Sequence, residues 1–94
     1  MGHMDDVKYK ILANDFCTRI LKGFREHEDT RLMIRSVKET WREARVDEDQ
    51  LAAAVCKWVY TFNYLMSEGC ESLSPLVFRI FKEVFKKDIV PMCI

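Results

Sequence analysis

His27 is followed directly by two carboxylates, Glu28 and Asp29, and it is the only histidine beyond residue 3. An imidazole beside a carboxylate can serve general acid–base catalysis when both groups reach a substrate. Here the three residues form a polar stretch between two amphipathic segments, which is typical of a solvated turn. The sequence also lacks the GxSxG, HExxH and Gly-rich phosphate motifs. We therefore expect no enzyme activity, no catalytic residue and no cofactor.

Four cysteines could bind a metal or form disulfides: Cys17, Cys56, Cys70 and Cys93. Their wide spacing contains no CxxC pair, and His27 is the only histidine available to join them, so no metal site is expected. Cys17 and Cys56 fall in strongly apolar segments, where a free cysteine behaves as a small hydrophobic residue. The pattern favours reduced structural thiols over a disulfide. It therefore indicates a reducing, intracellular compartment, cytoplasm or nucleus.

Five basic residues recur at steps of three and four between residues 30 and 45: Arg31, Arg35, Lys38, Arg42 and Arg45. On a helix they would lie within about 80° of arc, beside the apolar face. The planar guanidinium group suits bidentate pairing with carboxylates or phosphates. This basic row could be an ordinary solvated face, a docking surface for an acidic partner, or a contact surface for nucleic-acid phosphates. The formal net charge of zero, however, argues against a dedicated nucleic-acid-binding domain.

Large apolar side chains form the second set of candidates: Trp41, Trp58, Tyr60, Tyr64 and Met66. Three of them stand at even spacing between residues 58 and 64, so on a helix they cannot all enter one core seam. Exposed apolar patches mark interaction surfaces. We expect these residues to line a groove for a partner helix or a symmetric dimer, with the basic row steering an acidic partner.

The elements that must position these residues are helices, because apolar residues recur at three and four and no segment alternates as a strand does. The sequence predicts helices over about 6–26, 30–45, 47–68 and 74–87. The core faces are expected to include Tyr9, Leu12, Ala13, Phe16, Cys17, Ile20, Leu21 and Phe24; Met33, Ile34, Val37, Trp41 and Ala44; and Val77, Ile80, Phe81, Val84 and Phe85.

Two helix starts carry clear capping signals. Asp47 with Gln50 three residues later forms a capping-box pattern, and Val46 and Leu51 can pack as a hydrophobic staple around it. Ser74 is an N-cap candidate followed by Pro75, which is favoured at a first helical position.

The third predicted helix has almost no polar face, which indicates a central helix that the other three touch. Together with short connectors, this predicts an all-α fold, a compact bundle of about four helices. Two stacked HEAT-like hairpins are the alternative, followed by a three-helix core with the fourth helix docked on a partner subunit.

The length of 94 residues fits one domain. Residues 1–4 resemble the remnant of a cleaved tag, so we expect residues 5–94 to form a single domain cut from a longer protein. The longest uncharged run covers only residues 58–67, about half of what spans a bilayer, so no membrane partner is expected.

Taken together, these patterns predict a non-catalytic interaction module, an adaptor or assembly domain. Its partner would be a helical or acidic segment of another protein, or a second copy in a homodimer. The alternative is a nucleic-acid-binding accessory domain that uses the basic row.

Overall fold

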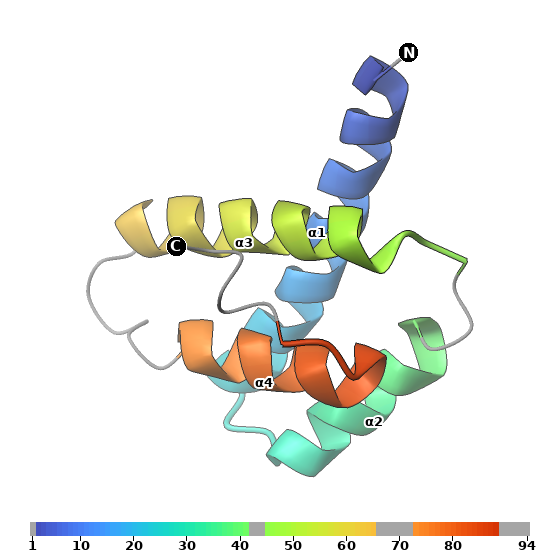
Figure 1. Ribbon diagram of the computed structural model, residues 1–94. Coiled ribbons are helices and arrows are strands. Elements are labelled where there is room, and N and C mark those ends of the chain that lie inside the picture. The colour runs from blue at the N-terminus through green and yellow to red at the C-terminus, as the bar shows by residue number, and fades with distance from the viewer. Residues whose placement is uncertain (1, 42–44, 66–72, 89–94) are drawn as a thin grey trace.

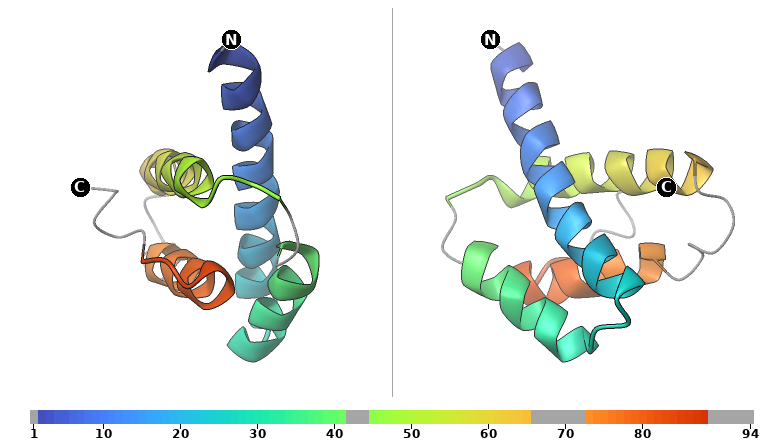
Figure 2. Two further views of the ribbon diagram at one scale, coloured as in Figure 1. Left: turned by 45° about the vertical axis from the view of Figure 1, so that its right-hand side comes forward. Right: turned by 180° about the vertical axis from the view of Figure 1, so that it is seen from behind.

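The computed structural model describes residues 2–41, 45–65 and 73–88, with side chains described for 7–41, 45–61 and 73–88. Its helices are α1 (Gly2–Arg25), α2 (Thr30–Trp41), α3 (Glu48–Leu65) and α4 (Leu73–Phe85), and no strand occurs in the described ranges (Figure 1). The predicted all-α bundle of four helices is confirmed. Figure 2 shows α3 and α4 stacked on the same side of α1, with α2 beside the C-terminal end of α1.

α1, rather than α3, is the helix that packs against each of the other three. α3 packs mainly on α1, less on α4, and touches α2 only marginally. The side of α3 that carries Ala53, Lys57 and Tyr60 is exposed. The predicted central, fully buried third helix is therefore wrong. Alanine makes a helix face apolar in sequence but is tolerated at a surface, so the run of alanines after Leu51 does not require burial on every side.

The core is apolar, and Phe16 of α1 lies at its centre. Its ring makes edge-to-face contacts with Trp41 of α2 at 6.0 Å between centroids and with Phe81 of α4 at 5.6 Å. Such aromatic pairs stabilise a fold beyond the area they bury. Most of the predicted core residues are buried: Tyr9, Ala13, Phe16, Cys17, Ile20, Leu21, Met33, Val37, Trp41, Val77, Ile80, Phe81 and Val84. Four others are only partly buried and pack against this core: Leu12, Phe24, Ile34 and Phe85. Ala44 lies outside the described residues.

The helices begin and end at somewhat different residues from those predicted. α1 begins at Gly2 instead of residue 6. α2 is described as Thr30–Trp41, residues 42–44 lie outside the described residues, and Arg45 lies outside any helix. α4 begins at Leu73, one residue before the predicted cap. The predicted end of the third helix, with Gly69 as its stop, lies outside the described residues.

α1 ends in a Schellman motif at His27, whose φ is 54°. The His27 N–H donates to the Phe24 carbonyl at 3.2 Å, and the Glu28 N–H donates to the Gly23 carbonyl at 2.8 Å. His27 thus occupies the left-handed position that usually holds glycine.

Gly23 of α1 lies directly against the side chain of Met33 of α2. A Cβ at this position would lie 2.5 Å from Sδ of Met33 and 2.6 Å from its Cγ. Met33 is buried, so it has little room to withdraw. The sequence alone shows only that Gly23 weakens its own helix, whereas the structure shows that the missing side chain lets α2 pack here.

Asp47 caps α3 as predicted, but the second hydrogen bond of the capping box is replaced. Its Oδ1 accepts hydrogen bonds from the N–H groups of Asp49 at 2.9 Å and Gln50 at 3.2 Å. In a capping box, the side chain at the Gln50 position would bond the Asp47 N–H. That N–H instead donates to the Tyr9 hydroxyl of α1 at 2.8 Å.

The cysteines depart from the expectation of reduced thiols. Cys17 is free and buried, and burial raises the pKa of its thiol, so it is a poor nucleophile. Cys56 is disulfide-bonded, so the prediction is wrong for this residue. Cys70 and Cys93 lie outside the described residues. The inference of cytoplasm or nucleus rested on reduced thiols and loses that support.

Candidate interaction surface

The basic row begins on α2 as predicted, but its first two members are paired with carboxylates. Arg31 Nη2 lies 3.3 Å from Asp29 Oδ2, and Arg35 Nε lies 4.0 Å from Glu39 Oε1. Hydrogen bonds from the backbone N–H and then the side chain of Arg31 lower the pKa of Asp29. The same Asp29 raises the pKa of Arg31 through a side-chain hydrogen bond.

The rest of the row does not continue along one helix. Lys38 is only half-exposed, and Arg42 lies outside the described residues. Arg45 is exposed, but it belongs to the segment between α2 and α3 rather than to a helix face. The 100° spacing that aligned the five residues therefore does not extend to Arg45.

The aromatic candidates separate into core and surface. Trp41 is 3% exposed and packs on Phe16, so it is not a surface anchor. Its Nε1 has no hydrogen-bond partner among the described residues. Trp58 is half-buried, and its Nε1 donates to Asn14 Oδ1 of α1 at 3.0 Å. This bond joins α3 to α1.

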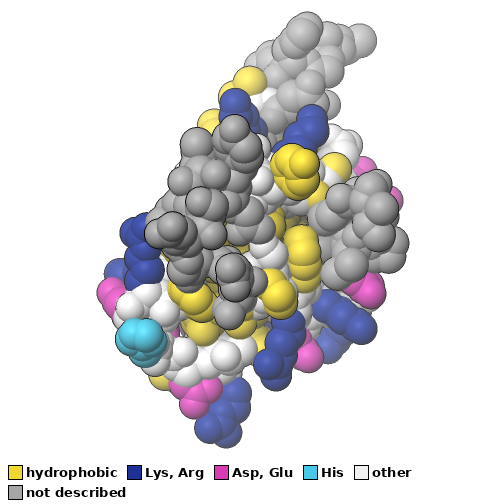
Figure 3. All heavy atoms as spheres, turned by 90° about the vertical axis from the view of Figure 1, so that its left-hand side faces the viewer, with side chains coloured by type: hydrophobic (Ala, Val, Ile, Leu, Met, Phe, Trp, Pro, Cys, Tyr) yellow, Lys and Arg dark blue, Asp and Glu magenta, His cyan; other side chains and the backbone are white. Residues whose placement is uncertain are grey.

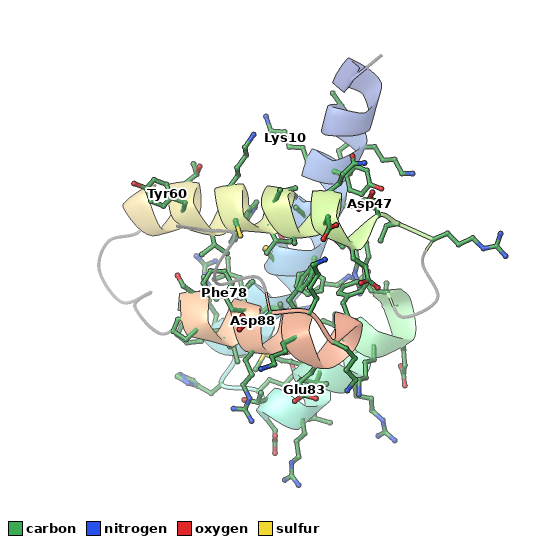
Figure 4. The ribbon with its side chains drawn as sticks, viewed as in Figure 1. Lys10, Asp47, Tyr60, Phe78, Glu83 and Asp88 are labelled. Carbon is green, nitrogen blue, oxygen red and sulfur yellow. The ribbon has the colours of Figure 1, made fainter. Side chains whose placement is uncertain are left out.

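Tyr60 alone among the candidates with described side chains is strongly exposed, at 78%. Figure 4 shows its ring near the C-terminal end of α3, pointing away from α4. The side chain of Tyr64 and the whole of Met66 lie outside the described residues. The predicted groove lined by these aromatics is thus not assembled by the residues that can be placed.

A surface that the sequence analysis missed lies on the outer side of α1. Val7 is 56% exposed and Ile11 is 63% exposed, one helical turn apart. Both residues stand about 160° around the helix from Tyr9, which faces the core. The N-terminal turns of α1 extend past α3 without another helix beside them (Figures 1 and 2). The signal was present in the sequence as a second apolar pair opposite the core stripe.

The same helix carries charges of both signs. From Gly2 to Arg25 it has three acidic residues, Asp5, Asp6 and Asp15, and five basic residues: Lys8, Lys10, Arg19, Lys22 and Arg25. Asp15 is ion-paired with Arg19 one turn away, at 3.0 Å. Figure 3 shows Lys and Arg side chains next to hydrophobic ones where α1 emerges from the bundle. We call Val7, Ile11 and these basic residues the α1 outer face.

A second apolar feature is an open hollow between the C-terminal end of α1, α2 and the start of α4. Its lining residues are Phe24, His27, Glu28, Thr30, Met33 and Leu76. His27 is exposed at its rim and serves as the left-handed cap of α1. The side chains there are too mixed in character to indicate one ligand.

Within the described ranges, no three His, Cys, Asp or Glu side chains are close enough to bind a metal ion together. No helix in the part of the chain that can be placed has the length and apolar character to cross a bilayer. Comparison with known protein families, curated proteins and solved structures gives no match to this chain.

Proposed function

We propose that this protein is a non-catalytic interaction module that binds a helical segment of another protein through the α1 outer face. The observation that carries the proposal is the exposure of Val7 and Ile11, spaced one turn apart on a helix that extends beyond its neighbours. Helix-recognition surfaces use anchors at this spacing.

The packing of the bundle supports this reading. The other side of α1 is already filled, because Tyr9, Ala13 and Phe16 are buried against the rest of the core. Val7 and Ile11 add nothing to that core, yet they leave more than half of each apolar side chain in water. Burying apolar area contributes about 25 cal/mol per Å², so a partner that covers this strip would gain stability that the isolated domain lacks.

Site-specific photo-crosslinking tests the proposal directly. A photoreactive amino acid replaces Ile11, and a matched variant carries it at Ser36, which is exposed on α2. In an extract of cells that express the protein, we expect a discrete adduct from position 11 and none from position 36. Mass spectrometry of the adduct identifies the partner chain and its contacting segment.

Two other outcomes of the crosslinking experiment would have a different meaning. Equal, diffuse crosslinking from both positions would mean that the strip is ordinary surface, and the interaction role would then be rejected. An adduct that contains two copies of this chain would assign the strip to self-association and assembly.

A further inference from the structure

The chain reverses direction directly after α4. Lys86 takes a left-handed conformation, with a φ of 57°. Figure 1 shows residues 86–88 running back along α4 toward its start, and Figure 4 shows Asp88 beside the middle of α4. Lys87 forms an ion pair with Asp49 in the first turn of α3. Residues 86–88 therefore lie at the seam between α3 and α4.

Cys56 lies on the side of α3 that Lys87 approaches. Asp49 and Cys56 are seven residues apart, which places them about 20° from each other around the helix and about 11 Å apart along it. Cys56 is 8% exposed and forms a disulfide. Cys17 is free, so the partner of Cys56 within this chain is either Cys70 or Cys93.

Cys70 would reach Cys56 only by an indirect path. It belongs to the connection between Leu65, the end of α3, and Leu73, the start of α4. Cys56 stands about 14 Å before Leu65 along the helix, so residues 66–70 would have to return beside the helix they have just left. Five residues span at most about 18 Å when fully extended, which leaves little length for the turn itself.

Cys93 reaches the same place without a detour. It follows Lys87 by six residues, which span up to about 21 Å, roughly twice the separation of Asp49 and Cys56 along α3. The path begins on the correct side of α3, because Lys87 is held at Asp49. Four of the six residues 89–94 are Ile, Val or Met, so this segment gains from covering apolar surface.

We propose that residues 89–94 form a strap along the side of α3 that carries Asp49 and Cys56, fastened by a disulfide between Cys56 and Cys93. The strap covers α3 around Ala52 and Cys56, so oxidation closes this side of α3 and reduction opens it. This surface is separate from the α1 outer face, and the proposal does not depend on the interaction role of that face.

Opening requires a dithiol reductant, and the exchange balances. One thiolate of the dithiol attacks a sulfur of the Cys56–Cys93 bond, which forms a mixed disulfide and releases the other cysteine as a thiol. The second thiol of the reductant then closes its own disulfide and releases the second cysteine. The dithiol gives up two electrons and two protons, and the two cysteine sulfurs take them up. The exposed ion pair of Lys87 and Asp49 adds little to hold the strap once the disulfide is gone.

Peptide mapping of the full chain identifies the pairing. The protein is denatured in the presence of an alkylating agent, without reductant, and digested with trypsin, which cuts after Lys and Arg. Cys56 then lies in fragment 46–57, Cys93 in fragment 88–94 and Cys70 in fragment 58–79. We expect mass spectrometry to find fragment 46–57 joined to fragment 88–94. Fragment 46–57 joined to 58–79, joined to a second copy of itself, or alkylated would overturn the proposal.

Maleimide labelling of the native chain measures the opening. Without reductant, neither Cys56 nor the buried Cys17 should react. After reduction by dithiothreitol, we expect Cys56 to react at least about tenfold faster than Cys17, because only Cys56 becomes accessible. Equally slow labelling of the two residues after reduction would show that the strap stays in place, and the redox opening would be rejected.

Serine variants test the role of each candidate partner. Cys70→Ser should keep the disulfide, and dithiothreitol should lower its Tm by about 10 °C or more, as in the wild type. Adding Cys93→Ser to this background should abolish the effect of dithiothreitol, and the missing Cys70 prevents a substitute disulfide. If Cys70→Ser alone abolishes the effect, the disulfide involves Cys70 and the strap is rejected.

Discussion

The Tyr9 hydroxyl of α1 accepts a hydrogen bond from the backbone N–H of Asp47, 38 residues along the chain, at 2.8 Å. Tyr9 is buried except for 8% of its surface, and Asp47 is the cap of α3. One phenol group therefore fixes the start of α3 against the first turns of α1. This contact positions α3 across α1 and leaves the opposite side of α1, with Val7 and Ile11, uncovered.

Tyr9→Phe tests this tether. The substitution keeps the ring in the core and removes only the hydroxyl, so we expect a loss of about 1 kcal/mol of unfolding free energy. For a chain of this size that lowers Tm by roughly 4–8 °C. Hydrogen exchange should show reduced protection at Leu51, whose N–H bonds to the Asp47 carbonyl. Tyr60→Phe is the matched control on an exposed ring, and it should leave both measurements unchanged.

Gly23→Ala is expected to destabilise the protein although alanine favours a helix by about 1 kcal/mol. The added Cβ would meet Met33 at 2.5 Å, and overpacking of a buried side chain costs about 1–3 kcal/mol. Urea unfolding should therefore show a net loss of about 1 kcal/mol.

A double-mutant cycle with Met33→Ala tests whether Met33 causes the loss of stability. It removes both Met33 atoms that Cβ would meet, so adding Gly23→Ala to that background should stabilise by up to about 1 kcal/mol. A stabilising effect of Gly23→Ala in both backgrounds would show that α2 does not depend on the glycine for its close approach.

His27→Gly is expected to stabilise the chain. The left-handed conformation costs a non-glycine residue about 1–2 kcal/mol, and the greater freedom of unfolded glycine offsets part of the gain. We expect a net increase of about 0.5–1 kcal/mol in unfolding free energy. Lys86→Gly, at φ 57° after α4, should act in the same direction. Lys22→Gly, inside α1, should instead destabilise by about 1 kcal/mol.

The sequence was sufficient to predict features that depend on neighbours along the chain. The apolar stripes through Phe16, Val37 and Phe81 follow helical periodicity, and the Asp47 cap depends on residues within one turn. Features that depend on residues far apart in the sequence could not be predicted. Periodicity does not show that Tyr9 reaches Asp47, that Cys56 forms a disulfide, or that α1 rather than α3 is central.

The candidate site could be predicted only in part for the same reason. Spacing aligned the basic row on the assumption that the helix continued to Arg45, but Arg45 lies outside any helix. The large aromatics were the stronger signal in the sequence. The exposed pair Val7 and Ile11 has smaller side chains and lies opposite a longer apolar stripe. Which of two apolar stripes is covered depends on tertiary packing, and here the rest of the bundle covers the one with Tyr9 and Phe16.

The disulfide of Cys56 predicts a specific thiol count. Alkylation of the unreduced, denatured chain should label two of its four cysteines, because the disulfide removes two thiols and Cys17 remains free. Labelling of the native chain should spare Cys17, because the buried thiol rarely forms the reactive thiolate. Labelling of all four in the denatured chain would show that Cys56 is reduced in solution.

Acid should destabilise the protein at Asp29 and Asp47, whose carboxylates cap the starts of α2 and α3. Hydrogen bonds from backbone N–H groups lower the pKa of Asp29, beside Arg31, and of Asp47, where Gln50 is the strongest donor. A carboxyl whose folded pKa is depressed adds stability above its unfolded pKa of about 4, and this is lost as pH falls through the folded value. Urea midpoints measured from pH 6 downward should therefore decline below about pH 4.

Asn substitutions separate the charge from the cap. Asparagine keeps an oxygen that accepts the same backbone hydrogen bonds but does not ionise. Asp29→Asn combined with Asp47→Asn should therefore retain most of the stability near pH 4 and show a shallower decline below it. Glu39→Gln removes an exposed carboxylate of α2 without touching either cap and controls for the loss of charge. If the double variant declines as steeply as the wild type, the caps are not what acid disrupts.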